Sequence, residues 1–190
     1  MSDQPPLRRR DGELFVLSVL VLYLELMLIR WIGTEIRIFA YLGNLVLVLC
    51  FFGVGLGFYL SRQPALLNRV GISLLLLAVL VANPGRLPWL DLKILTYILG
   101  GFEDYNIWQV WLKPQFVLVL GGLALLGVLM LLLLFVFVPI GQLLGRIFAD
   151  HPKPIRAYSF NIAGSLAGVW LFQTASVFSL PPTWWFVTGT

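Results

Sequence analysis

Long apolar stretches recur along the 190-residue chain, and short polar segments separate them. A helix needs about 20 mostly apolar residues to cross the roughly 30 Å hydrocarbon core of a bilayer. The stretches at 14–32, 38–60, 65–82, 116–138 and 157–180 approach or reach that length. We therefore predict an all-α, polytopic transmembrane helical bundle of about five spans, with the start of a sixth.

Helix-breaking residues set the limits of these stretches. Asn83-Pro84-Gly85 stops the third and Pro181-Pro182 stops the fifth. In chain order the expected segments are a cytoplasmic tail (1–13), the first three spans (14–82), an outer aromatic loop with an interfacial helix (83–115), the fourth span (116–138), an inner amphipathic connector (139–156), the fifth span (157–180) and the start of a sixth (181–190). Because the last stretch is cut short, we expect the sequence to continue beyond Thr190.

Composition agrees with a membrane location. The chain is 59% hydrophobic and 12% charged, with a mean hydropathy of +0.92. Soluble domains are nearer half apolar and a quarter charged, and so short a chain has too small an interior to hide the excess. We expect a multi-pass protein of the bacterial inner membrane, in contact with membrane lipids.

The net charge of +4 does not indicate nucleic-acid binding, because the basic residues are scattered and form only one run, Arg8-Arg9-Arg10. Lys and Arg are enriched in cytoplasmic loops of membrane proteins. A cytoplasmic N-terminus places this run, Arg62, Arg69 and Arg146 on the cytoplasmic side, so we predict that orientation.

The outer loop is rich in aromatic residues, among them Trp89, Trp108 and Trp111. Tryptophan prefers the membrane–water interface, since its ring is apolar and its N–H seeks water. An interfacial belt is the simplest interpretation. A docking surface for a partner, or for a quinone-like or pigment ligand, stays open, as do lipid or pigment contacts elsewhere. No cofactor is identifiable from the sequence.

Polar residues inside the spans are costly to place in lipid and are therefore informative. Glu25 and Arg30 lie in the first span, and they point about 140° apart on a regular helix. Asn44 and Gln173 lie at a similar depth in the second and fifth spans. We predict a buried polar cluster of these four residues in the outer half of the bilayer. It serves either to hold the helices together or as a proton or substrate site.

Small residues indicate close helix packing. Gly53 and Gly57 in the second span, and Gly164 and Gly168 in the fifth, match the small-xxx-small pattern of membrane helix contacts. The sequence contains no nucleotide-binding, zinc or triad motif. The single histidine, His151, is expected in a loop rather than at a metal, and we predict no catalytic site and no metal site.

Two segments resemble the N-terminal membrane domain of bacterial spermidine synthase-like proteins, which are related to polyamine aminopropyltransferases. The first is Leu22-Tyr-Leu-Glu-Leu-Met-Leu-Ile-Arg30 with the glycine-rich stretch after it, and the second is Tyr158-x-x-Asn161-x-x-Gly164-x-x-x-Gly168. The resemblance implies a multi-helix module followed by a soluble catalytic domain, none of whose site residues is present here. The long aromatic loop and Trp184-Trp185 depart from the family pattern.

Three functions remain open at the level of sequence. The chain is a non-catalytic anchor or scaffold of a spermidine synthase-like protein, an accessory structural subunit of a larger respiratory or photosynthetic membrane complex, or a small-molecule transporter. The first two predict other membrane subunits or domains as partners. A transporter would use Glu25 and Arg30 along its path.

Overall fold

The computed structural model describes residues 7–36, 39, 43–82 and 116–177. Within these ranges every regular element is an α-helix, and no strand is present. The helices are α1 (Leu7–Glu35), α3 (Gly43–Tyr59), α4 (Leu67–Ala82), α7 (Phe116–Ala149) and α8 (Pro154–Val177). Two of them are long and apolar enough to cross a membrane, over Leu7–Glu35 and Leu120–Ala149. The all-α prediction is confirmed for this part of the chain.

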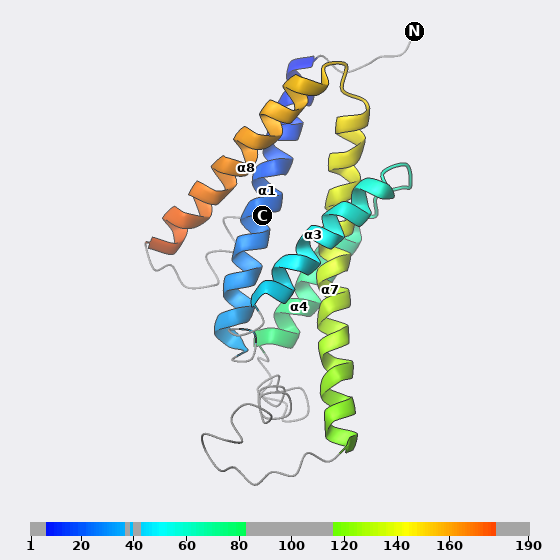
Figure 1. Cartoon of the computed structure of the whole chain (residues 1–190), viewed down its shortest axis with the longest axis vertical. Coiled ribbons are helices and arrows are strands. Elements are labelled where there is room, and N and C mark those ends of the chain that lie inside the picture. The colour runs from blue at the N-terminus through cyan, green and yellow to red at the C-terminus, as the bar shows by residue number, and fades with distance from the viewer. Residues whose placement is uncertain (1–6, 37–38, 40–42, 83–115, 178–190) are drawn as a thin grey trace.

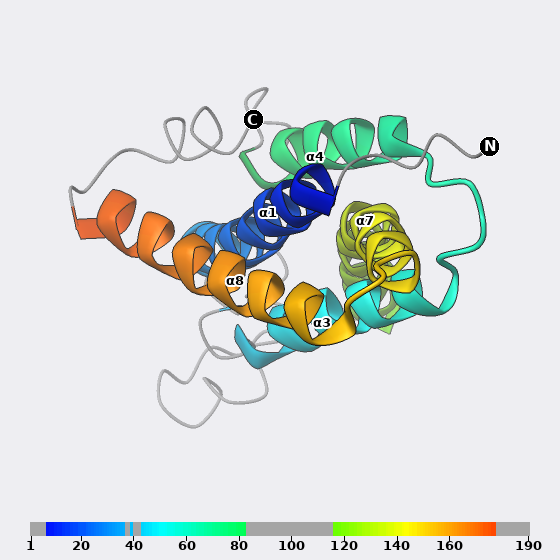
Figure 2. The same cartoon turned by 90° about the horizontal axis from the view of Figure 1, so that it is seen from above.

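Helix α1 lies at the centre of the arrangement and contacts each of the other four helices (Figure 1). Seen from above, α8 runs along one side of α1, and α4 and α7 lie on the other (Figure 2). The beginning of α1, the end of α7 and the beginning of α8 meet at one end of the bundle. This end contains the short turn that joins α7 to α8, and polar side chains from the turn and from α1 contact one another there.

Helix α1 has a buried stripe with three- and four-residue spacing. Its buried members include Asp11, Leu14, Ser18, Val21, Glu25, Leu28 and Ile32. This spacing keeps side chains on one face of a helix. Three members of the stripe at seven-residue spacing, Asp11, Ser18 and Glu25, are polar and lie on the packed face among aliphatic side chains.

Two helix pairs come together at glycines. On α3, a Cβ added to Gly53 would lie 2.8 Å from the Phe137 Cβ, and one added to Gly57 would lie 2.7 Å from the Gly141 Cα, both on α7. Such distances leave no room for a side chain, so these glycines let the two backbones approach closely. Gly145, one turn beyond Gly141, packs in the same way against Phe58 and Ser61.

The second pair is α1 with α8. A Cβ on Gly164 would lie 2.5 Å from the Phe15 carbonyl oxygen, and one on Gly168 would lie 2.6 Å from that of Val19. The α3–α7 and α1–α8 contacts together place Gly53, Gly57, Gly164 and Gly168, the four glycines that the sequence marked for packing, at helix–helix interfaces. The partner surface on α1 is backbone, which explains why no larger residue fits.

Helix α7 does not end before Pro139, where the sequence placed the start of a separate connector. It continues through Pro139 to Ala149, and its 34 residues span about 51 Å at 1.5 Å per residue. Proline removes one backbone donor, but such breaks are tolerated in apolar helices that neighbours support. Helix α1 likewise begins at Leu7, inside the expected tail.

Candidate functional site

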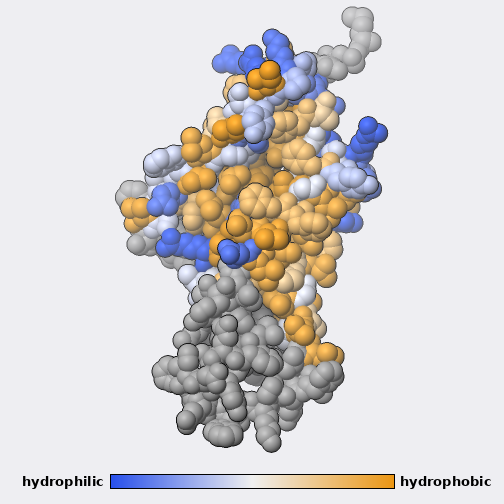
Figure 3. Space-filling model, in the orientation of Figure 1, coloured by the Kyte–Doolittle hydropathy of each residue, from blue (hydrophilic) through white to orange (hydrophobic). Residues whose placement is uncertain are grey.

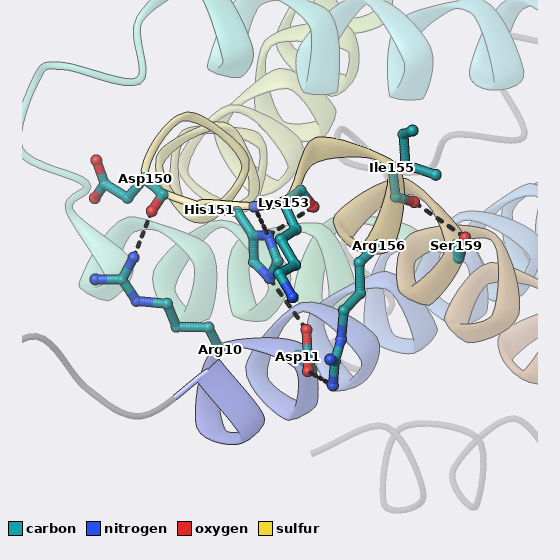
Figure 4. Close-up of polar contacts among 8 residues, drawn as sticks. All are labelled: Arg10, Asp11, Asp150, His151, Lys153, Ile155, Arg156 and Ser159. Carbon is teal, nitrogen blue, oxygen red and sulfur yellow. Dashed lines mark hydrogen bonds and ion pairs between the residues drawn. The ribbon is translucent and has the colours of Figure 1, made fainter.

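Asp11, His151 and Arg156 form a polar cluster, here called the Asp11 cluster, where α1 meets the turn between α7 and α8 (Figure 4). The His151 Nε2 lies 3.1 Å from Asp11 Oδ1, and both side chains are almost fully buried. The Arg156 guanidinium lies 2.6 Å from Asp11 Oδ2 and is 47% exposed. Helix α1 and the α7–α8 junction, about 140 residues apart in the sequence, therefore meet at one carboxylate.

The hydrogen bonds of His151 determine its orientation. Its Nδ1 lies 3.1 Å from the Lys153 backbone N–H and 2.9 Å from the Lys153 carbonyl oxygen. Because the Asp11 carboxylate can only accept, both contacts are satisfied by the tautomer in which Nδ1 accepts from the Lys153 N–H and Nε2 carries the proton and donates it to Asp11. The 2.6 Å approach of Arg156 lacks hydrogen-bond alignment, so Asp11 Oδ2 accepts no hydrogen bond from a described residue.

A further contact ties the same end of α1 to α7. The Arg10 guanidinium donates to the backbone carbonyl of Asp150, the residue before His151. Proline residues on either side of Lys153 restrict the turn, so His151 is held in place from both directions. The turn is thus locked to α1 by one backbone acceptor and one buried carboxylate.

The chemistry open to the Asp11 cluster is limited by access. Both ring nitrogens of His151 are engaged, and its side chain is fully buried. A general base needs a nitrogen within reach of a substrate proton, and none is available here. Across the described ranges, no group of three His, Cys, Asp or Glu side chains gathers to hold a metal ion. The geometry is that of a structural lock.

About two helical turns beyond Asp11 on α1, Ser18 contacts α8. Its Oγ lies 2.7 Å from the Leu14 carbonyl and 2.8 Å from Asn161 Oδ1. One hydroxyl proton cannot satisfy two acceptors, so a flipped Asn161 amide, donating from its nitrogen to Ser18, satisfies both groups better. Asn161 was singled out from sequence by resemblance, and its observed partner is Ser18. Tyr158, the other such residue, is 61% exposed.

The four residues expected to form a buried polar cluster do not share one buried site. Glu25 is only 3% exposed, whereas Arg30, Asn44 and Gln173 have exposed side chains. Arg30 donates to the Ser176 hydroxyl at the far end of α8. A similar depth along the spans does not determine which way a side chain points around its helix.

Glu25 lies on the packed face of α1 among aliphatic side chains. Its Oε1 is fully enclosed and accepts no hydrogen bond within the described part of the chain. Cys50, buried on α3, belongs to the same hydrophobic core as Leu24 and Leu28, which flank Glu25 along α1. Glu25 is therefore the most costly polar residue of the α1 stripe.

Sequence reasoning missed the Asp11 cluster because it assigned Asp11 to a tail and His151 to a loop. The seven-residue spacing of Asp11, Ser18 and Glu25 was the available signal, since it continues the buried stripe of α1 toward the N-terminus. Trp89, Trp108 and Trp111, with the whole 83–115 loop and the 181–190 segment, lie outside the described residues. Comparisons with models of known protein families, with characterised proteins and with solved structures find no match.

Proposed function

We propose that this chain is a non-catalytic membrane scaffold: a helical module that is embedded in a lipid bilayer and anchors further domains or subunits there. One observation carries the proposal, which is the wide apolar surface that the bundle leaves uncovered. Soluble monomers rarely expose contiguous apolar patches larger than a few hundred Å². Figure 3 shows such a surface over the middle of the described helices, with hydrophilic side chains gathered at its upper end.

The uncovered surface is made of large aliphatic and aromatic side chains from four helices. Those at least half exposed include Val48, Phe51, Phe52, Ile72, Leu75, Leu120, Leu131, Leu166 and Trp170. Exposing these side chains to lipid tails carries no hydrophobic free-energy penalty, because lipid tails are themselves apolar. The proposal assigns all five helices to the bilayer. Of these, α1 and α7 are long and apolar enough to qualify as membrane spans by length and hydropathy.

Charge supports a cytoplasmic N-terminus. The end of the bundle where α1 begins, α7 ends and α8 begins carries most of the described basic side chains, among them Arg8, Arg9, Arg10, Arg146, Lys153 and Arg156. Basic residues beside transmembrane helices remain on the cytoplasmic side. In this orientation the Asp11 cluster lies at the inner surface of a bacterial inner membrane and fixes the α7–α8 turn against α1.

A scaffold role follows from the kind of polar site that the bundle contains. In the Asp11 cluster, Asp11 and His151 are buried and contact each other, which suits rigidity rather than turnover. The resemblance to the membrane domain of spermidine synthase-like proteins points the same way, since that domain precedes a separate catalytic domain. We take the module's partners to be other membrane-associated protein and the surrounding lipid.

Fractionation tests the membrane assignment first. The protein should remain with the membrane after alkaline carbonate washing and should float with reconstituted vesicles. The scaffold role is tested by purification in mild detergent followed by mass spectrometry. A stoichiometric protein partner is the expected result. Release into the carbonate supernatant refutes the membrane assignment, and a preparation without any partner polypeptide refutes the scaffold role.

A further inference from the structure

A groove runs along α7 where α3 and α4 leave it uncovered, on the side that the bundle leaves open to its surroundings. It has a volume of about 370 Å³, within the range of roughly 300–1,000 Å³ that small-molecule sites occupy. Its walls are apolar over most of its length, with Leu56, Leu131 and Phe135 among the lining residues. Leu131 and Phe135 are also about half exposed, so the groove is open along its side.

The polar lining residues lie at one end of this groove. Gln63 and Arg69 come from the segment that ends α3 and begins α4, and Gln142 comes from α7. The Gln142 amide is occupied, since it donates to the Leu60 carbonyl over 3.3 Å. Arg69 is exposed, and its guanidinium forms no hydrogen bond or ion pair with any residue that the structure describes. An unpaired cation therefore marks the entrance.

The length of the groove matches one leaflet. Its lining on α7 runs from Leu131 to Gln142, which corresponds to about 16 Å at 1.5 Å per residue. Half of a hydrocarbon core is roughly 15 Å. The mean cross-section is then on the order of 20–30 Å², whereas a helix with side chains, about 10 Å wide, covers roughly 80 Å². A single extended hydrocarbon chain fits within this section, whereas a helix would protrude from the open side of the groove.

We infer that the α3–α4–α7 groove binds one anionic phospholipid of the cytoplasmic leaflet, with an acyl chain along Leu131 and Phe135 and its phosphate on Arg69. The inference rests on the proposed membrane function and on its orientation. Guanidinium groups pair with phosphate through two parallel hydrogen bonds, and the cytoplasmic leaflet is the one enriched in anionic lipids. The apolar walls hold the tail, and Arg69 selects the headgroup charge.

Native mass spectrometry tests this site on the full-length protein in detergent. Phosphatidylglycerol and phosphatidylcholine with identical acyl chains are added at equal concentration, so that only headgroup charge differs. Arg69→Ala should weaken phosphatidylglycerol binding about tenfold, the scale of one lost charge-assisted contact, and should weaken phosphatidylcholine less, because the choline cation offsets the charge of its phosphate. The matched control is Arg62→Ala, which removes an exposed arginine from the same connecting segment outside the groove lining.

A second pair of variants tests the tail contact. Leu131→Trp fills the groove and should weaken both lipids, whereas Leu123→Trp, at an exposed position on α7 outside the lining, should weaken neither. Equal effects of Arg69→Ala and Arg62→Ala, or no lipid preference in the unmodified protein, overturn the site. A lipid-free dimer that Leu131→Trp dissociates would show a second copy of the chain in the groove and also overturns it.

Carbonate washing of the same proteins separates this failure from failure of the proposed function. If the unmodified protein is released from membranes, the membrane assignment and the lipid site both fall. If every variant stays in the membrane but Arg69→Ala binds phosphatidylglycerol normally, the lipid site alone is wrong.

Discussion

Removing the Asp11 carboxylate is the sharpest test of the lock at the α1 end of the bundle. Asp11→Ala leaves the Nε2 proton of fully buried His151 without its acceptor. An unsatisfied buried donor costs about 1–3 kcal/mol. Arg156 is 47% exposed, so its lost ion pair adds about 0–1 kcal/mol after screening by water.

The expected destabilisation is therefore about 2 kcal/mol in total. For a chain of this size that corresponds to a fall in Tm of about 4–8 °C. The assay is thermal unfolding of the detergent-solubilised protein, followed by the loss of its monodisperse peak in size-exclusion chromatography. Asp11→Asn should retain most of the stability, because an amide oxygen still accepts the His151 proton.

The matched control is Glu13→Ala, two residues further along the same helix. Glu13 pairs with Arg9 over 3.0 Å, but both side chains are largely exposed. Such i,i+4 pairs are worth only about 0.3–0.5 kcal/mol. If Asp11→Ala and Glu13→Ala lower Tm equally, His151 does not depend on Asp11 and the lock does not exist. A double-mutant cycle with His151→Ala measures the coupling directly.

Two further substitutions test the packing of the bundle. Gly57→Ala should destabilise the protein by about 1–3 kcal/mol in the same thermal assay, because its Cβ would meet the α7 backbone. The control Gly55→Ala faces open space and should leave Tm unchanged or raise it. Equal Tm values for the two variants would refute the close α3–α7 approach. Glu25→Leu should leave Tm unchanged or raise it, since the variant removes an enclosed carboxyl oxygen with no hydrogen-bond donor among the described residues. A fall of several degrees would reveal a partner for Glu25.

Helix positions along the chain were largely predictable, and helix ends were not. Apolar runs of sufficient length specified where α3, α4 and α8 lie to within a few residues. Helix α1 extends back to Leu7 because Asp11 is held by residues near 150, a contact that no local pattern encodes. Pro139 predicted a break, yet α7 continues through it because packing against α3 supports both sides.

The candidate site was harder to predict than the fold. The 140° separation of Glu25 and Arg30 correctly implies that they face different surroundings, and one is buried while the other is exposed. Asn44 and Gln173 were grouped with them by depth alone. Which side of a helix is covered depends on its neighbours, and that information resides in long-range contacts such as those of Gly164 and Gly168.

The central claim is that the exposed apolar face of the bundle contacts lipid, and spin labels on that face test it most directly. Cys50→Ala supplies a cysteine-free background, in which Phe51→Cys labels the apolar face of α3 and Arg62→Cys labels the polar end. In reconstituted vesicles, the label at 51 should relax with oxygen, which dissolves in lipid, and the label at 62 with a water-soluble nickel chelate. Strong relaxation of the label at 51 by the nickel chelate would contradict the claim.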